Sequence, residues 1–357
     1  MTIAYLIDYD IYQNNGVVQK IFQQSQKWIE QKNTVYYISS KTLTIYDSNK
    51  NPIYNLKPLN IGSSRVATAL KLLYSSYFLG RLLTRIEFDV LYMRYRLYMP
   101  FFTRVLRKYK VVMEINSDDT KEYKLHSKLT HFYNIFTRNF VLKKIDTFIA
   151  VSEELKVRFS YLNKPTYVIA NGIDTSKYNI KESKNKRPTL VFIGTPNQSW
   201  HGIDKIIKMA DYFKEFDFYI IGTKGKNTQN VKYFGYLQNE DSTKIIQKCD
   251  VGIGTLSLYE TGLSEASPLK TRQYLACGIP LIYAYKDTDL KGDESFVLAL
   301  ENTQNNLDFE KIKQFVEKVY NNIEIKYDAR KFAEDILEYN KKEKIRLKIF
   351  QKVLDAK

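Results

Sequence analysis

Short apolar runs alternate along the first half of the chain with longer segments in which apolar residues recur every three or four positions. The runs predict strands at Ile3–Asp8, Thr34–Ser39, Val90–Met93, Val111–Ile115 and Thr147–Val151, and the first helix is predicted at residues 17–31. Branched apolar runs separated by helices are typical of a parallel sheet covered on both faces. This part of the chain is therefore predicted to be a doubly wound α/β domain.

The same alternation restarts near Asn171. Strands are predicted at Thr189–Ile193, Phe216–Ile221, Val231–Gly235, Val251–Thr255 and Pro280–Ala284, with helices at 202–213, 241–247 and 268–276. The charged segment Lys181–Pro188 is predicted to be an exposed linker. Residues 309–357 are highly charged and predicted to be helical. The pattern indicates two doubly wound sheets joined by a linker.

Glycine-containing loops follow the first predicted strand of each half. Ligands of such sheets bind beyond the carboxyl ends of the strands, where these loops turn into helices. Gly16 follows Asn14 and Asn15 in the first half, and Gly194 opens the loop 194–202 in the second. Neither loop is a dinucleotide fingerprint or a P-loop, so dehydrogenases and P-loop NTPases are disfavoured.

The segment 265–282, EASPLKTRQYLACGIPLI, offers an acid, two cations and the start of a helix. A helix N-terminus and the cations Lys270 and Arg272 favour phosphates, and the carboxylate of Glu265 can accept hydrogen bonds from sugar hydroxyls. These features suit a phosphorylated, hydroxylated ligand. On the segment alone, a capped surface helix with ordinary charges remains an equal alternative.

The formal charge of +16 is unevenly spread along the chain. Residues 62–110 hold ten lysines and arginines against two acids, interleaved with leucine, tyrosine and phenylalanine. This mixture favours contact with an anionic membrane surface. Amphipathic helices with solvated cations are the alternative, and nucleic acid is not a predicted partner because no recognised nucleic-acid module accompanies the charge.

Other sequence features bear on compartment and metal binding. The sequence contains no run of eighteen uncharged apolar residues, so no membrane span is predicted, and the start of the chain has no basic leader. Cys249 and Cys277 do not make a disulfide framework, which favours a reducing compartment, the cytoplasm by default. Without a suitable Asp-x-Asp loop or a His/Cys cluster, no metal is predicted.

Several motifs, taken in order, resemble the retaining, family 4 type of GT-B glycosyltransferase. They are Asn15-Gly16, VSEEL at 151–155, NGID at 171–174, FIGT with WHGIDKII within 192–207, CDVGI at 249–253 and the segment 265–282. The resemblance implies an α/β fold with two Rossmann-like domains facing each other across a cleft. Residues 1–170 would bind the acceptor and residues 171–335 the nucleotide-sugar donor. Residues 336–357 would form a helix returning to the first domain.

The resemblance also assigns residues to the donor. Glu265 matches the first acid of the family's Glu–seven residues–Glu motif, but the second acid falls on Gln273. The two phosphate-binding cations fall on Thr195 and His201. Charge at the diphosphate would then come from Lys270, Arg272 and backbone N–H groups, with His201 helping only when protonated. The SPLK sequence is similar to that of many bacterial surface-polysaccharide transferases. The donor-binding residues implied are Gly16, Gly194, Thr195, His201, Ser267, Leu269, Arg272 and Gln273.

In the first domain, Asn116 occupies a position where related enzymes often place a histidine near the reacting sugar. An asparagine can hydrogen-bond a sugar but cannot exchange protons near neutral pH. Asp118, Asp119 and Glu122 lie just downstream. They could reach the acceptor or simply cap a helix.

These observations predict a retaining, metal-independent glycosyltransferase of polysaccharide biosynthesis in the cell envelope. It would use a UDP- or GDP-linked sugar, need no further cofactor, and act on a lipid-linked or polysaccharide acceptor at the inner face of the plasma membrane. Glu265, Lys270 and Asn116 are the predicted catalytic residues. The departures at Thr195, His201 and Gln273 keep a second hypothesis open, a non-catalytic GT-B subunit that stabilises a partner transferase. A sugar-nucleotide epimerase or hydrolase is a third.

Overall fold

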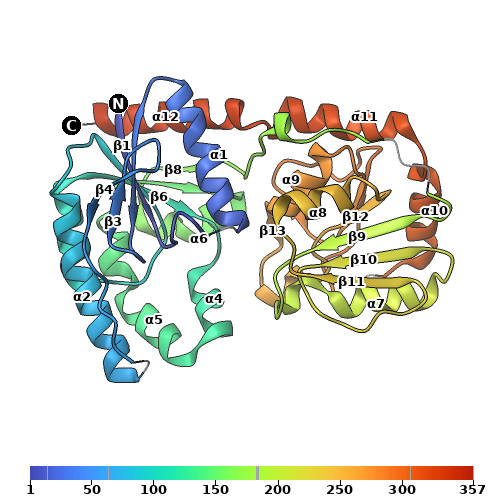
Figure 1. Cartoon of the computed structure of the whole chain (residues 1–357), viewed down its shortest axis with the longest axis horizontal. Coiled ribbons are helices and arrows are strands. Elements are labelled where there is room, and N and C mark those ends of the chain that lie inside the picture. The colour runs from blue at the N-terminus through green and yellow to red at the C-terminus, as the bar shows by residue number, and fades with distance from the viewer. Residues whose placement is uncertain (14, 63, 182–184, 306, 357) are drawn as a thin grey trace. The chain divides into compact units, whose positions relative to one another are not determined.

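The chain folds into two compact units (Figure 1). The computed structural model describes residues 1–13, 15–62, 64–181, 185–305 and 307–356. The first unit comprises Met1–Ile169 and Glu343–Lys357, and the second comprises Ala170–Lys342. Sequence analysis places the corresponding boundaries at 170/171 and 335/336. The second boundary of the structure lies inside the last helix, α12 (Tyr339–Asp355).

An eight-stranded sheet forms the centre of the first unit, in the order β4-β3-β2-β1-β5-β6-β7-β8. Its parallel strands are β1 (Thr2–Ile7), β2 (Thr34–Ser39), β5 (Val90–Arg94), β6 (Lys110–Ile115), β7 (Thr147–Ala150) and β8 (Thr166–Val168). Five of them lie where apolar runs predict strands, and these runs are almost entirely buried. The prediction of an all-parallel sheet is wrong at one edge, where β3 (Thr44–Tyr46) and β4 (Pro52–Asn55) add an antiparallel hairpin.

Helices cover this sheet. They are α1 (Gly16–Glu30), α2 (Arg65–Leu83), α3 (Pro100–Val105), α4 (Asp119–His126), α5 (Lys128–Leu142), α6 (Glu153–Phe159) and α12, with short 3-10 turns at Leu106–Lys108 and Ser160–Leu162. Asn15 caps α1, because its side chain accepts hydrogen bonds from the N–H groups of Val17 and Val18 at 3.0 and 2.9 Å. Asn14 lies outside the described residues.

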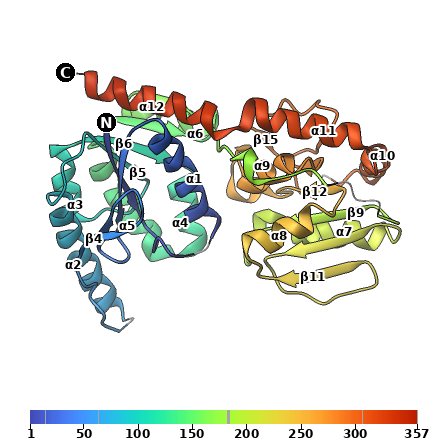
Figure 2. The same ribbon diagram turned by 45° about the horizontal axis from the view of Figure 1, so that its top comes forward.

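The C-terminal helix α12 packs on α1 within the first unit (Figure 2). The indole N–H of Trp28 donates to Glu343 at 2.7 Å, and the rings of Trp28 and Phe350 lie 5.4 Å apart. Both aromatic residues are fully buried. The last residues of the chain are therefore part of the core formed by the first ones.

A six-stranded parallel sheet forms the second unit, in the order β11-β10-β9-β12-β14-β16. The strands are β9 (Thr189–Ile193), β10 (Asp217–Ile221), β11 (Val231–Gly235), β12 (Val251–Ile253), β14 (Leu281–Tyr283) and β16 (Val297–Ala299). The helices are α7 (Ile203–Tyr212), α8 (Asn239–Ile246), α9 (Leu269–Ala276), α10 (Phe309–Val319) and α11 (Ile323–Phe332), followed by a π turn at Ala333–Leu337. Short 3-10 turns lie at Thr175–Lys177, Ser199–His201 and Leu258–Thr261, and β13 (Glu265–Ala266) pairs with β15 (Lys286–Asp287).

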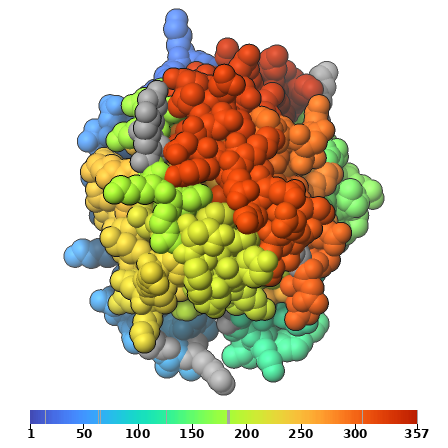
Figure 3. Space-filling view, turned by 90° about the vertical axis from the view of Figure 1, so that its right-hand side faces the viewer, coloured from blue at the N-terminus to red at the C-terminus, as the bar shows by residue number. Residues whose placement is uncertain are grey.

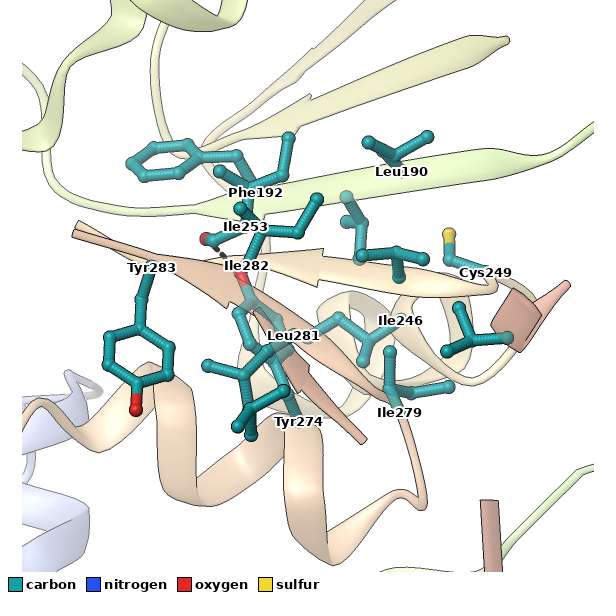
Figure 4. Packing of buried hydrophobic residues seen from close by; sticks show 14 of the residues in the cluster. Leu190, Phe192, Ile246, Cys249, Ile253, Tyr274, Ile279, Leu281, Ile282 and Tyr283 are labelled. Carbon is teal, nitrogen blue, oxygen red and sulfur yellow. Dashed lines mark hydrogen bonds between the residues drawn. The ribbon is translucent and has the colours of Figure 1, made fainter. Parts of the chain in front are cut away.

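The core of this unit holds the ends of its central strands in place (Figure 4). Tyr274 of α9 is fully buried, and its hydroxyl donates to the carbonyl of Ile253 at 3.2 Å while accepting from the N–H of Ile193 at 2.9 Å. One side chain thus joins the ends of β9 and β12. On another face, Tyr212 of α7 stacks on Phe309 of α10 at 4.2 Å, and Figure 3 shows yellow-green α7 beside the red C-terminal helices.

The charged segment 181–188 does not join the two units, which is a correction to the predicted linker. Residues 182–184 lie outside the described residues, but Asn185 and Arg187 belong to the second unit and bond within it. The amide of Asn185 donates to Asp250 at 2.8 Å, and Arg187 donates to the carbonyl of Glu215 at 2.9 Å. The segment therefore leads into β9 as part of the second domain.

Candidate functional site

Each sheet has one point where the strand order reverses. In the first unit this point lies between β1 and β5, and in the second it lies between β9 and β12. Loops at the carboxyl ends of the strands diverge there and leave room for a ligand. Asn116 follows β6 beside the first reversal point, and Gly194 follows β9 at the second.

The Gly194 loop is held tightly against its surroundings. A Cβ atom on Gly194 would lie 2.6 Å from the ring of Phe192 and 2.8 Å from Nε2 of His201. Gly222, at the end of β10, has a φ of +94°, and a Cβ on it would overlap the carbonyl oxygen of Gly194. Only glycines allow the ends of β9 and β10 to approach this closely.

Lys270 lies against the same loop. Its ammonium is 3.3 Å from Nδ1 of His201 and 4.0 Å from the centre of the Phe192 ring. The structure therefore brings together three of the predicted donor residues, Gly194, His201 and Lys270.

Burial governs the charges of this group. Burial, reinforced by the charge of Lys270, lowers the pKa of His201 to about 2, so the imidazole is neutral. The expectation that a protonated His201 helps to neutralise phosphates is thereby removed. Burial also lowers the pKa of Lys270 well below its usual range. In the described part of the chain no carboxylate forms an ion pair with this ammonium.

Helix α9 begins beside this cation. Leu269 is its first residue, Pro268 precedes it without a side-chain cap, and the first turn contains no acid. The positive end of the helix dipole and the ammonium of Lys270 therefore act in the same place. An anionic group would be favoured there by both.

Arg272 has a different environment from the one the sequence predicts. It is 0% exposed, and its guanidinium binds both oxygens of Asp287 at 2.5 and 2.9 Å. The same group also donates to Asp289 at 2.8 Å and to the carbonyl of Asn171 at 3.1 Å. Its charge is satisfied inside the protein, so we no longer assign Arg272 to the diphosphate.

Two more of the predicted donor residues contact other parts of the second unit. Ser267 accepts a hydrogen bond from the N–H of Asn171 at 2.8 Å, which fixes the NGID loop to the start of α9. The side-chain amide nitrogen of Gln273 donates to Asn239 at 3.3 Å and to Thr243 at 3.0 Å, both on α8. No described residue donates to the amide oxygen of Gln273, which leaves that atom able to accept a hydroxyl.

Glu265 and Thr195 differ in burial. Glu265 is buried in β13, which pairs with β15, whereas Thr195 is exposed directly after Gly194. The small hydroxyl of Thr195 can donate a hydrogen bond but brings no charge.

In the first unit, Asn116 lies beside a buried ion pair. Lys20 of α1 contacts the carboxylate of Glu114, and its ammonium donates to the side-chain oxygen of Asn116 at 3.1 Å. Burial lowers the pKa of Lys20 to about 8, although the charge of Glu114 opposes the shift. Burial alone would raise the pKa of Glu114, but Lys20, Arg346 and Arg94 together lower it. The side-chain nitrogen of Asn116 is buried and has no hydrogen-bond partner among the residues that the structure describes.

A cavity of about 130 Å³ opens at this reversal point. Its lining combines polar and aromatic side chains from the ends of β1, β5 and β6 and from α4: Asp8, Tyr9, Arg94, Tyr95, Asn116, Ser117, Glu122 and Tyr123, together with Leu6, Ile7 and Ile21. Within the described residues the guanidinium of Arg94 has no hydrogen-bonded or ion-paired partner. The cavity therefore offers both donors and acceptors to a hydroxylated ligand.

Of the three acids downstream of Asn116, one lines this cavity. Asp118 caps α4 and pairs with Arg158 at 2.6 Å, and Asp119 pairs with Arg138 at 2.7 Å. Glu122 lines the cavity. The helix-capping alternative is thus confirmed for Asp118.

Lys20 and Arg94 are the residues that sequence reasoning missed. Lys20, Gln24 and Trp28 are spaced by four, which places them along one face of α1, and all three are buried. A lysine on the same helical face as a tryptophan was the available signal. Arg94 was counted only as one of many cations, because the sequence places it after the predicted strand Val90–Met93 but does not show that this strand pairs with β1.

No cluster of three or more potential metal-binding side chains occurs among the described residues. Nor does any helix in those residues combine the length and apolarity that crossing a membrane requires.

Comparison with known proteins bears on both units. Residues 15–177 match the family described as Glycosyltransferase Family 4. Sucrose-phosphate synthase from Thermosynechococcus elongatus has a similar structure, with a TM-score of 0.76, 12% identity and complete coverage of both chains. The fold is that of a GT-B glycosyltransferase. The predicted resemblance to a family 4 glycosyltransferase of GT-B fold is therefore confirmed, while the retaining type stays a prediction.

Two other solved structures were found in complex with ligands. Anabaena HepE in complex with UDP has a TM-score of 0.65 and 12% identity, covering 99% of this chain and 100% of its own. An alpha-glucosyltransferase in complex with UDP and a 13-mer DNA has a TM-score of 0.66 and 14% identity, covering 98% of this chain and 99% of its own. No curated protein matches the sequence.

Proposed function

We propose that this GT-B protein transfers a sugar from a nucleoside diphosphate sugar to a lipid-linked or polysaccharide acceptor. The observation that carries the proposal is the ammonium of Lys270, which lies at the strand-order reversal of the second unit without an ion-paired carboxylate among the described residues. A buried cation without a counter-ion is costly. The diphosphate of a UDP- or GDP-linked donor would supply that counter-ion.

The donor would bind in the second unit. Its diphosphate would lie against Lys270, the N–H groups at the start of α9 and the Gly194 loop. The amide oxygen of Gln273 would accept one ribose hydroxyl, and Glu265 would contact the sugar. Leu269 and Thr195 would contribute backbone and hydroxyl contacts.

The acceptor would bind in the first unit. Its hydroxyls would enter the cavity lined by Asp8, Arg94, Asn116 and Glu122. The unpartnered nitrogen of Asn116 would then donate to an acceptor oxygen. Gly16, which the resemblance assigns to the donor, is the first residue of α1, and because Ile21 of that helix lines the cavity we propose that its backbone N–H contacts the acceptor instead.

Catalysis would consist of alignment and charge stabilisation. A retaining transfer without a protein nucleophile passes through an oxocarbenium-like state while the nucleoside diphosphate departs. Lys270 and the α9 terminus would stabilise the departing phosphate, so we propose that the reaction needs no metal ion. Addition of EDTA should leave the rate unchanged.

Thermal unfolding with nucleotides tests the donor site. UDP or GDP should raise the melting temperature of the wild-type protein, and Lys270→Met should abolish that shift. Lys208→Met is the matched control, because Lys208 is an exposed lysine on α7 of the same unit. Equal protection of the wild-type protein and the Lys270 variant would overturn the assignment.

A non-catalytic subunit is the second candidate, favoured by the occupied guanidinium of Arg272 and the neutral His201. Incubation with UDP- and GDP-sugars and a lipid-linked or polysaccharide acceptor distinguishes the two by mass spectrometry. Product that depends on Glu265 supports the transferase. Nucleotide protection without any product, combined with stabilisation of a co-expressed transferase, supports the subunit.

We propose a peripheral position at the inner face of the plasma membrane, supported by the basic and aromatic composition of the first unit. We expect no nucleic-acid acceptor, although one structurally similar protein was solved with DNA. A gel-shift experiment with duplex DNA at physiological salt should show no specific complex.

A further inference from the structure

Exposed apolar side chains gather on one part of the first unit. Of twenty large apolar residues exposed in the described chain, eleven lie between residues 66 and 140, on α2, α3, α4 and α5. Scattered exposed apolar residues are ordinary on a soluble protein, but a concentration of this kind marks an interaction surface.

Helix α5 carries the more exposed stripe. Leu129, Phe132, Phe136 and Phe140 are spaced by three, four and four residues, so they lie along one face of the helix. Each is more than half exposed, and Phe136 reaches 77%. A surface helix normally turns such a stripe toward the core. Here it faces solvent.

Helix α2 carries a second stripe. Val66, Leu70, Leu73 and Tyr77 are spaced by four, three and four residues and are all exposed. Ordinary core packing does not account for them, because the residues of α2 that enter the core, such as Leu79, Leu82 and Leu83, lie on other positions of the helix.

Aromatic contacts connect the two stripes. The ring of Phe140 lies 5.4 Å from Tyr98, and the hydroxyl of Tyr133 donates to the carbonyl of Tyr98 at 2.8 Å. Three residues further on, Phe101 lies 5.9 Å from the ring of Tyr77. Residues 98–101 thus bridge α5 to α2, and both helices lie below the sheet in Figure 1.

Cations accompany the apolar stripes. Residues 120–145 contain six lysines and arginines and a single acid. Lys124, Lys128 and Lys143 are exposed and pair with no acid among the described residues. Arg104 is exposed on α3, between the two stripes in sequence. The surface therefore combines apolar side chains with the positive charges of Lys124, Lys128 and Lys143, which have no ion-paired acid among the described residues.

We infer that this surface, defined by the exposed residues of α2 and α5 together with Phe101, Arg104, Lys124, Lys128 and Lys143, docks on an anionic lipid bilayer. The phenylalanines and leucines would enter the boundary between headgroups and acyl chains, and the cations would contact the headgroup phosphates. The inference names the docking surface behind the proposed membrane position, and it rests on the proposed function only for the lipid-linked acceptor. Vesicle binding needs no sugar transfer.

A bilayer fits these features better than a protein partner does. The surface is broadly apolar and carries an excess of positive charge. An anionic bilayer complements both features, because it offers an apolar interior and negative charge over the whole area of contact. The apolar residues occupy two helices rather than one groove shaped for a single segment.

Flotation with vesicles tests the surface. The wild-type protein should float with vesicles of phosphatidylcholine and phosphatidylglycerol. It should bind much less to vesicles of phosphatidylcholine alone, and much less to the mixed vesicles at about 0.5 M salt, which screens surface charges. Phe132→Ser combined with Phe136→Ser should lower the partition coefficient about tenfold or more. Each of Lys124→Gln and Lys128→Gln should lower it about fivefold. Tyr236→Ser, an exposed aromatic of the second unit, is the control and should change nothing.

A tryptophan at position 136 gives a second, direct measurement. The emission of Phe136→Trp should shift to the blue on binding and be quenched by lipids brominated in the upper acyl chain. Vesicle binding that is unaffected by the phenylalanine variants would overturn the inference. Self-association that Phe136→Ser abolishes, in a protein that does not float, would overturn it in favour of a protein interface. Nucleotide protection measured on the same variants stays intact if only the docking surface is disturbed, which separates this failure from failure of the proposed function.

Discussion

Arg272 offers the sharpest test, because the sequence predicts a donor-binding cation and the structure gives it an internal ion pair. Replacing it by leucine keeps much of the apolar stem but removes every hydrogen bond of the guanidinium. Asp289 would keep Lys342, which binds its two oxygens at 2.8 and 2.9 Å. Among the described residues, Asp287 would keep only the N–H of Asp289 at 3.0 Å.

The cost therefore falls on Asp287. Its side chain is 0% exposed, so its carboxylate would remain buried without a cation. Removing one partner of a buried ion pair costs about 3–5 kcal/mol. With a urea dependence of about 2–3 kcal/mol/M, the unfolding midpoint of the second unit should fall by about 1–2 M.

The two tryptophans of the chain allow each unit to be followed separately. Trp28 lies in the first unit and Trp200 in the second. Urea unfolding is monitored by fluorescence in Arg272→Leu with and without Trp200→Phe. The loss should appear in the transition that Trp200 reports and be absent from that of Trp28.

Two controls isolate the mechanism. Arg187→Leu removes an arginine that lies 3.6 Å from the carboxylate of Asp217 in a partly exposed ion pair. This change should lower the free energy of unfolding by no more than about 1 kcal/mol. Adding Asp287→Asn to Arg272→Leu should recover part of the lost stability, because no buried charge is then left alone. A loss below about 1 kcal/mol in Arg272→Leu would refute the ion-pair reasoning. Normal stability with lost UDP protection would restore Arg272 to the donor site.

Three further predictions concern the site. Because burial lowers the pKa of Lys270, its ammonium should lose the proton at a pH below the ordinary lysine pKa of about 10.4. UDP affinity measured by calorimetry should therefore fall as the pH is raised through that lower range. Lys270→Arg should make the affinity nearly independent of pH there. Gly222→Ala should lower the melting temperature strongly, because its Cβ would overlap the Gly194 carbonyl, whereas Gly235→Ala, with a φ of +64° and open space around it, should cost only about 1 kcal/mol. Asn116→Ala should lower product formation while leaving UDP protection intact, since Asn116 lies in the first unit; loss of both would contradict its assignment to the acceptor.

The sheets could be predicted from sequence where an apolar run lies between polar turns, which holds even for the edge strand β11. β2, β9 and β11 have the predicted bounds, since branched apolar runs between polar turns leave few other structures open. The hairpin of β3 and β4 was missed because its strands have three and four residues and lie among polar ones. At an edge, exposed strands such as β4 lose the apolar pattern that identifies the others.

The candidate site could be predicted only as far as local motifs extend. Gly194, His201 and Lys270 belong to loops that the motifs identify, and the structure brings them together. The partners of Arg272 lie fifteen and seventeen residues further on, after another strand, so their contact is a product of tertiary packing. An arginine near a helix start looks the same in sequence whether its guanidinium faces a ligand or an aspartate.

The departure at position 201 follows from the place of Lys270. Nδ1 of His201 lies 3.3 Å from that ammonium, so a second permanent cation at position 201 would place like charges next to each other inside the protein. A neutral imidazole avoids this repulsion and can accept a hydrogen bond from the ammonium. Neither of the two cations that the resemblance implies is present at positions 195 and 201, and the charge of a bound diphosphate would be met by Lys270 and the α9 terminus together. The neutral residue at position 201 and the buried ammonium of Lys270 are therefore one arrangement, since a permanent cation at position 201 would repel that ammonium.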